Sequence, residues 1–192
     1  INVGVSNHHI HLKESDFKLL FNKDSLEVKN MLTQKGQFAS TSLLTIKTSK
    51  GEISNVRVLG PFRDYTQIEI SRTDAYKLGI EPPVRDSGDL DGSSVVTLIG
   101  PKGSIETNGC ILAHRHIHIT SEQKKELDLD DVVSIKYGGE KGGILDNVKC
   151  KITPDAFIEL HIDTYACIGL SPTRYMPCTA HQKRKQVTST CF

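Results

Sequence analysis

The stretch S-N-H-H-I-H-L at residues 6–12 recurs in altered form as A-H-R-H-I-H-I at residues 113–119. His9 and His11 match His116 and His118 at one common offset, with an isoleucine inside each pair. V-L-G-P at residues 58–61 and L-I-G-P at residues 98–101 form a second echo. These repeats predict two related β units within one chain.

Each H-x-H pair falls in a segment that alternates nonpolar and polar residues, as a strand does. Because strand side chains at positions i and i+2 point to the same face, the two imidazoles of each pair can share one metal ion. Ile10 and Ile117 then face the core. A single H-x-H pair often consists of two histidines that are hydrogen-bonded on the surface or in the core and bind no metal. Two such pairs at a repeat offset favour metal binding. Imidazole suits zinc, with copper, nickel and iron as competitors.

Zinc needs further ligands, because it prefers four positions and a catalytic zinc keeps one of them open. The candidates are Glu69 and His161, each on a predicted strand, although Glu69 has an alternative as an exposed carboxylate. Asp163 shares a face with His161 and is a candidate for holding an imidazole in place. The remaining histidines are weaker candidates: His8, His114 and His181.

Arg63 follows the turn-forming pair Gly60-Pro61. Its planar guanidinium can bind two oxygens of a phosphate or carboxylate. A surface ion pair with Asp64 explains the residue equally well.

Alternation predicts strands over residues 3–12, 38–48, 51–59, 67–71, 95–99, 104–106, 114–120, 132–137, 148–152 and 158–162. Helical spacing predicts helices over residues 14–21, 73–78 and 121–127. The proline-rich segment 82–88 is expected to be a linker or a functional loop, and the glycines at 138–143 a hairpin turn. The basic tail, residues 181–192, is expected to be disordered or weakly docked, with a docking segment as the alternative. Many short strands with few helices are typical of β-barrels or sandwiches.

The chain has 192 residues and a formal net charge of +1, which argues against a general nucleic-acid binder. It contains no nonpolar run of membrane-spanning length. The five cysteines form no C-x-x-C pair, which favours a reducing cytoplasm over a disulfide framework. No cysteine lies in a recognisable nucleophile motif.

Several motifs together resemble the PduL-type phosphotransacylases, or phosphate propanoyltransferases. These motifs are V-G-V-S-N-H-H-I-H-L (3–12), V-R-V-L-G-P-F-R-D-Y-T-Q-I-E-I-S-R-T-D-A (56–75), P-P-V-R-D-S-G-D-L (82–90), R-H-I-H-I (115–119), G-G-I-L-D-N-V (142–148) and L-H-I-D-T (160–164). The resemblance implies a mainly β fold of two small barrels with short capping helices and an active site between them. One barrel would take residues 1–7 with 114–192, and the other residues 8–113.

The resemblance also implies two metal ions, usually zinc. One would be held by His9, His11 and Glu69, and the other by His116, His118 and His161. Arg63 matches the arginine of the family that handles phosphate, and Tyr76 is a candidate contact for coenzyme A. The expected partners are acyl-CoA, phosphate and acyl phosphate, with no nucleic acid and no membrane. A homo-oligomer, typically a dimer, is expected in the cytoplasm or in a bacterial microcompartment linked to propanediol degradation.

The chain departs from the family pattern after Asp163-Thr164, where a shortened segment follows, and residues 171–192 contain no recognisable motif of the family. No N-terminal targeting peptide, which some members have, is expected from residues 1–192. The expected reaction is direct attack of phosphate on the thioester, without an acyl-enzyme. The rival hypotheses are a metal-dependent hydrolase, a closed structural metal protein and an inactivated homologue.

Overall fold

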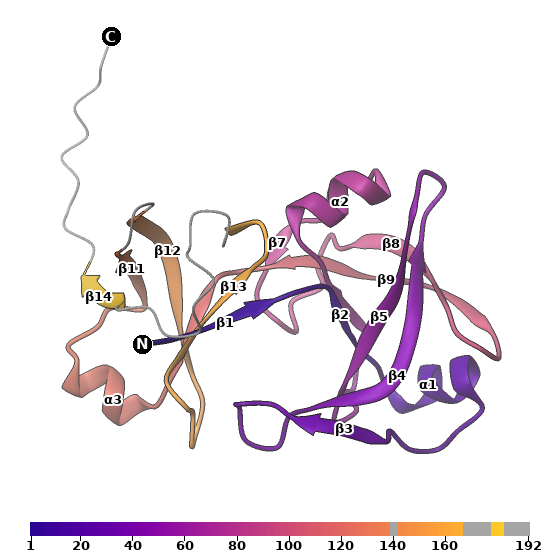
Figure 1. Ribbon diagram of the computed structural model, residues 1–192, viewed down its shortest axis with the longest axis horizontal. Helices are drawn as coiled ribbons and strands as arrows, with labels where there is room; N and C mark the ends of the chain where they lie inside the picture. Colours follow the sequence, from indigo (N-terminus) through magenta and orange to yellow (C-terminus); the bar gives the residue numbers. More distant parts are fainter. Residues whose placement is uncertain (139–141, 167–177, 183–192) are drawn as a thin grey trace, which may run out of the picture. The chain divides into compact units, whose positions relative to one another are not determined.

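The computed structural model describes residues 1–138 and 142–166, together with the backbone of a strand at 178–182. These residues form fourteen strands and three helices (Figure 1). Their bounds are β1 (Asn2–Ser6), β2 (His9–His11), α1 (Glu14–Phe21), β3 (Val28–Met31), β4 (Phe38–Lys47), β5 (Glu52–Gly60), β6 (Gln67–Glu69), α2 (Arg72–Leu78), β7 (Val84–Arg85), β8 (Ser94–Ile99), β9 (Ser104–Ala113), β10 (His116–Ile119), α3 (Ser121–Glu126), β11 (Val132–Tyr137), β12 (Gly143–Ile152), β13 (Glu159–Asp163) and β14 (Cys178–Gln182). The mainly β prediction is confirmed.

The chain folds into two compact units, each of which is assembled from separate stretches of the sequence. One contains Ile1–Val5 and Arg115–Ile162, and the other contains Ser6–His114 and Asp163–Tyr165. The change of unit after Val5 explains why the predicted strand at residues 3–12 is two strands, β1 and β2. β1 pairs in the first unit, whereas β2 pairs with β5 and β6 in the second.

The unit containing Ser6–His114 closes into a six-stranded β-barrel. Its strands pair in the cyclic order β4–β5–β2–β6–β9–β8, and β8 returns to β4. β4 and β9, ten residues each, are the long strands that pair on both sides (Figure 1). β3 and β7 extend the sheet beyond the closed ring.

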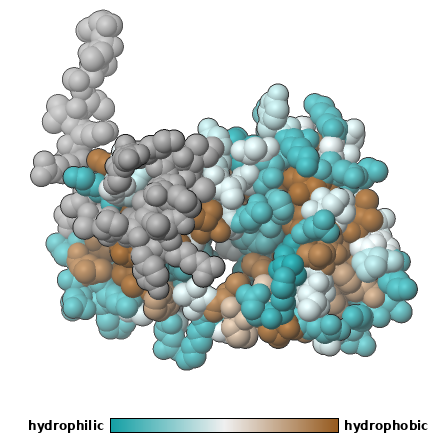
Figure 2. Space-filling model, in the orientation of Figure 1, coloured by the Kyte–Doolittle hydropathy of each residue, from teal (hydrophilic) through white to brown (hydrophobic). Residues whose placement is uncertain are grey.

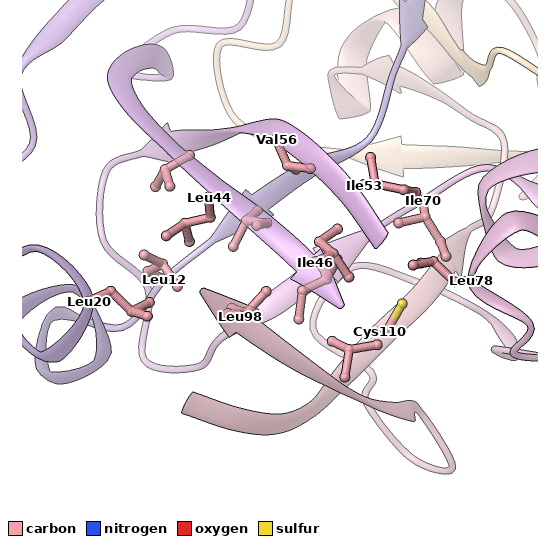
Figure 3. Close-up of a cluster of buried hydrophobic side chains, with 14 of the residues drawn as sticks. Leu12, Leu20, Leu44, Ile46, Ile53, Val56, Ile70, Leu78, Leu98 and Cys110 are labelled. Carbon is pink, nitrogen blue, oxygen red and sulfur yellow. The ribbon is translucent and has the colours of Figure 1, made fainter. Parts of the chain in front are cut away.

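The barrel core is built from alternate residues of these strands. Leu44, Ile46, Val58 and Leu98 are buried among other aliphatic side chains. Leu20 of α1 and Leu78 of α2 lie on opposite sides of the cluster drawn in Figure 3, so the two short helices extend the core from both sides. Burial of this nonpolar surface is the main favourable contribution to folding.

Leu98 offers a direct test of this core, because its neighbour Ile99 lies on the opposite face of the same strand. Leu98 is fully buried, and Ile99 is 36% exposed. Leu98→Ala should lower the free energy of unfolding by about 2–5 kcal/mol. Ile99→Ala is the matched control and should cost less than about 1 kcal/mol. Urea denaturation of both variants measures the difference, and equal losses would contradict the assigned register.

The unit containing Arg115–Ile162 carries a six-stranded sheet in the order β1-β13-β10-β12-β11-β14. Its own core cluster includes Ile117, Val133, Ile135, Val148 and Leu160. α3 begins at a complete capping box between Thr120 and Gln123 and contributes no buried residue. The helix therefore lies on the surface of its unit.

The two units repeat one three-stranded arrangement around their H-x-H strands. β2 pairs in parallel with β5 and antiparallel with β6. β10 likewise pairs in parallel with β12 and antiparallel with β13. The central isoleucines, Ile10 and Ile117, are both fully buried, as the alternation predicts. This shared arrangement supports the internal repeat seen in the sequence.

Some elements differ from the sequence-based predictions. β3 has four exposed residues, so it lacks the hydrophobic alternation that reveals a strand. β7 lies within the proline-rich segment but at the end of the sheet order, where missing amide donors are tolerated. At the start of the basic tail the backbone of His181 and Gln182 pairs with β11, which favours the alternative of a docking segment over a disordered or weakly docked end. Residues 183–192 lie outside the described part of the chain.

The glycine-rich hairpin is confirmed by the antiparallel pairing of Tyr137 with Gly143, although residues 139–141 are not described. None of the three described helices has the length and nonpolar character that a bilayer-spanning helix needs. The face drawn in Figure 2 interleaves hydrophilic with hydrophobic side chains, which is ordinary for a folded protein surface.

Candidate functional site

The first candidate metal site lies on β2 and β6. These strands pair antiparallel, and their register places His9 directly opposite Glu69. His9 Nε2 lies 3.4 Å from Glu69 Oε2. His9, His11 and Glu69 each offer one ligand atom, and these three atoms lie within 4.8 Å of one another. The structure therefore brings together the three residues that the sequence proposes for this site.

Contacts at the other ring nitrogen orient the His9 imidazole. His9 Nδ1 lies 3.1 Å from the carbonyl oxygen of Asn7 and 3.1 Å from Ser6 Oγ. Because a carbonyl only accepts hydrogen bonds, Nδ1 carries the hydrogen and the lone pair remains on Nε2, toward Glu69. Metal-binding histidines commonly have such a partner at the second nitrogen.

The second candidate site lies on β10 and β13. His116 stands opposite His161, and His116 Nε2 lies 3.2 Å from His118 Nε2. The ligand atoms of His116, His118 and His161 lie within 4.8 Å of one another. In a tetrahedral zinc site with bonds of about 2.0–2.1 Å, two nitrogens are roughly 3.3 Å apart. The observed separation is close to this value.

Burial disfavours the protonated form of one ring in this second cluster, that of His118. Desolvation of this buried ring, followed by repulsion from His161 and His116, lowers the pKa of His118 to about 3. A metal ligand must present an unprotonated imidazole. The donor sets, two imidazoles with a carboxylate and three imidazoles, are both known for zinc sites that keep a position open. The residues present therefore fit zinc at both places.

Glu159 is a close neighbour of the second site that sequence analysis did not identify. Its Oε2 lies 2.7 Å from His161 Nε2, and the residue stands opposite His118 across the strand pair. The spacing of two residues from His161 on one strand is the signal that could have found it. Glu159 therefore adds a carboxyl group beside the three histidines.

Gly4 of β1 packs closely against this same cluster. A Cβ at Gly4 would lie 3.0 Å from Cδ2 and 3.1 Å from Nε2 of His161. Gly4→Ala should therefore displace the imidazole and weaken zinc binding at the second site by about tenfold or more. Gly138→Ala is the control, because no atom lies within 4 Å of its added carbon. Titration with a zinc-competing dye measures both, and equal affinity in the two variants would contradict the predicted displacement.

Arg63 lies in the same unit as the first site. Its backbone N–H donates to the Leu12 carbonyl at 2.9 Å, directly after the H-x-H strand. Its Nη1 donates to Ser87 Oγ at 2.8 Å and Tyr65 Oη at 3.3 Å. The predicted alternative, an ion pair with Asp64, is not observed. Within the described residues the bonded partners of the guanidinium are neutral oxygens, so its charge remains available to an anion.

The remaining candidate residues do not belong to either triad. Tyr76 is 90% exposed on α2 and is not a member of either triad. His8 Nδ1 lies 3.4 Å from Asp74 Oδ2, which belongs to the capping box of α2. Burial raises the pKa of the Cys110 thiol to about 12, so this cysteine is unsuited to act as a nucleophile. Cys150 is half-buried, and its pKa is raised by the same cause.

Comparison with known proteins identifies the family of this chain. A model of the phosphate propanoyltransferase family matches residues 2–169. A phosphate propanoyltransferase from Thermotoga maritima is 46% identical over 85% of this chain and 80% of the relative. Relatives with the same name from Rhodopseudomonas palustris and Salmonella typhimurium are 44% and 42% identical, over 85% of this chain and 74% and 80% of their own lengths. The chain therefore belongs to the phosphate propanoyltransferase family.

Proposed function

We propose that the chain transfers an acyl group, propionyl or acetyl, between coenzyme A and inorganic phosphate with the assistance of bound zinc. The observation that carries this proposal is that hydrogen bonds through Ser87 and Gln67 join Arg63 to the glutamate of the two-histidine, one-glutamate cluster. The family match supplies the class of reaction. Two zinc ions per chain would be held by the two triads described above.

Zinc at the first triad would supply Lewis acidity for the thioester carbonyl and a soft partner for sulfur. His9 and His11 would hold it through neutral imidazoles, and Glu69 through a carboxylate oxygen. His116, His118 and His161 would hold the second ion.

Arg63 would bind phosphate, because a guanidinium fork matches two phosphate oxygens. Ser87 would assist it. Its oxygen accepts hydrogen bonds from Arg63 and Gln67, so its own hydrogen can be donated to an anion. Held in this way, phosphate is oriented for attack rather than encountered at random.

The bond changes follow directly. A phosphate oxygen attacks the carbonyl carbon, and the carbon–sulfur bond breaks with its electron pair moving to sulfur. The products are acyl phosphate and coenzyme A, with any proton of the phosphate passing to the thiolate. Arg63 also stabilises the oxyanion that develops on the way. The high pKa of Cys110 supports a route without an acyl-enzyme.

The test is loss of propionyl-CoA and acetyl-CoA with and without phosphate, on protein of measured zinc content. We expect thioester loss only with phosphate, abolished by chelation and restored by zinc. Loss without phosphate would instead identify a hydrolase. Loss that persists after zinc has been removed completely would contradict the role of the metal. A radiolabelled acyl group retained on the denatured protein would contradict direct attack.

A further inference from the structure

Gln67 completes the four-residue face on which the first triad lies. In the β2–β6 register, His9 stands opposite Glu69, and His11 stands opposite Gln67. Gln67 and Glu69 are two residues apart on one strand, so they share a face. Three of the four positions are the candidate zinc ligands, and the fourth is this glutamine.

Gln67 is fully buried, and both ends of its amide are bonded. Its Oε1 accepts a hydrogen bond from the backbone N–H of Gly88 at 2.7 Å. Its Nε2 donates to Glu69 Oε1 at 2.6 Å and to Ser87 Oγ at 2.9 Å. Since the Gly88 N–H can only donate, it determines which end of the amide is oxygen, and both hydrogens of Nε2 are then in use.

These contacts constrain Glu69. One carboxylate oxygen, Oε1, is bound to the amide of Gln67, and the other, Oε2, faces His9. Gln67 therefore favours a carboxylate that offers a single oxygen to a metal. Partners of this kind typically change metal affinity or activity by about 10–100-fold when they are removed.

The same amide also constrains the loop that contacts Arg63. Gln67 binds both Ser87 and Gly88, and Ser87 Oγ in turn accepts from Arg63 Nη1. Gly88 has a φ of +98°, a backbone conformation that residues other than glycine rarely adopt. This turn therefore requires a glycine next to Ser87. One buried amide thus joins the metal carboxylate to the residue beside the arginine.

In the second unit the position that corresponds to Gln67 is occupied by Glu159. Opposite His118 stands Glu159, which again contacts the ligand two residues along its own strand, His161. In both units the fourth position of the face holds a polar side chain bonded to its neighbouring ligand. The repetition indicates that this position has a role beyond filling space.

We propose that Gln67 is a positioning residue that sets both the metal-binding oxygen of Glu69 and the Ser87–Arg63 pair for phosphate. The inference rests on the proposed function for its effect on phosphate, but not for its effect on zinc. Gln67 itself contacts neither metal nor substrate in this proposal.

The experiment uses two variants of the full chain. Gln67→Met keeps approximate volume and removes all three hydrogen bonds. Gln67→Glu keeps the shape and can still accept from Gly88, but loses both donors and places a second carboxylate against Glu69. Gln123→Met is the control, because it removes another glutamine side chain that bonds to backbone, in the capping box of α3.

The first readout is zinc affinity, measured by competition with a chelating dye and independent of activity. We expect both Gln67 variants to lose about 10–100-fold in affinity at one of two sites, and the control to keep both affinities. If Gln67→Met does not fold, as judged by thermal melting, Gln67→Glu carries the test. Unchanged zinc affinity in a folded Gln67 variant would overturn the part of the proposal that concerns Glu69.

The second readout is the kinetics with phosphate at saturating zinc. We expect a rise of about tenfold or more in KM for phosphate, and no further rise when Ser87→Ala is added to Gln67→Met. Additive losses, or an unchanged KM, would overturn the action through Ser87. If the unmodified protein shows no phosphate-dependent thioester loss, the proposed function fails, while the zinc titration still decides the role of Gln67 at Glu69.

Discussion

Arg63→Ala should lower kcat/KM for phosphate by about 10²–10³-fold while both zinc ions remain bound. The magnitude is that typical of removing one preorganised donor from a developing oxyanion. Zinc should remain because the guanidinium bonds to Ser87 and Tyr65 and is not a member of either triad. Elemental analysis and steady-state kinetics at varied phosphate measure the two quantities on the same preparation.

The matched control for this variant is Arg72→Ala, which removes an exposed arginine from the first turn of α2. It should change kcat/KM by less than about twofold, since isolated surface charges contribute little. Near-normal kinetics in Arg63→Ala would remove the arginine from phosphate binding. Loss of zinc together with activity would instead show that Arg63 acts by supporting the first site.

His9→Ala should remove one of the two zinc ions and nearly all turnover together. His9 supplies one of three ligand atoms, so its removal leaves only His11 and Glu69 to hold the ion. The loss of activity should exceed the roughly 10–100-fold expected when only an outer partner of a ligand is removed. Zinc per chain and kcat are the measurements.

His8→Ala is the control for His9→Ala, because the two histidines are adjacent and His8 instead contacts Asp74. It should keep both zinc ions, and kcat should stay within about threefold of the unmodified value. A His9→Ala protein that retained two ions would contradict the first site. A protein that lost one ion but kept full activity would assign this zinc a purely structural role.

The features that depend on short-range patterns could be predicted from the sequence. The alternation around Ile10 and Ile117 placed both isoleucines in cores and each histidine pair on one face. The helix at Glu14–Phe21 was predicted with its observed bounds, because nonpolar spacing and acidic residues in the first turn are local signals. Side chains alternate between the two faces of a strand, and each H-x-H pair supplies only two ligands from its own strand. The further metal ligands were therefore sought among polar residues on other predicted strands.

The pairing of distant segments was decided only by the tertiary structure. Gln67 lies only two residues before Glu69, but its contacts depend on the β2–β6 register and on the turn at Gly88. Glu159 gains its role in the same way, from the pairing of β10 with β13. Strand register depends on the burial of whole faces and on closure of the barrel, which involve residues far apart in the chain. The histidine motifs are therefore determined by the sequence itself, whereas the hydrogen bonds that orient them exist only after the strands have paired.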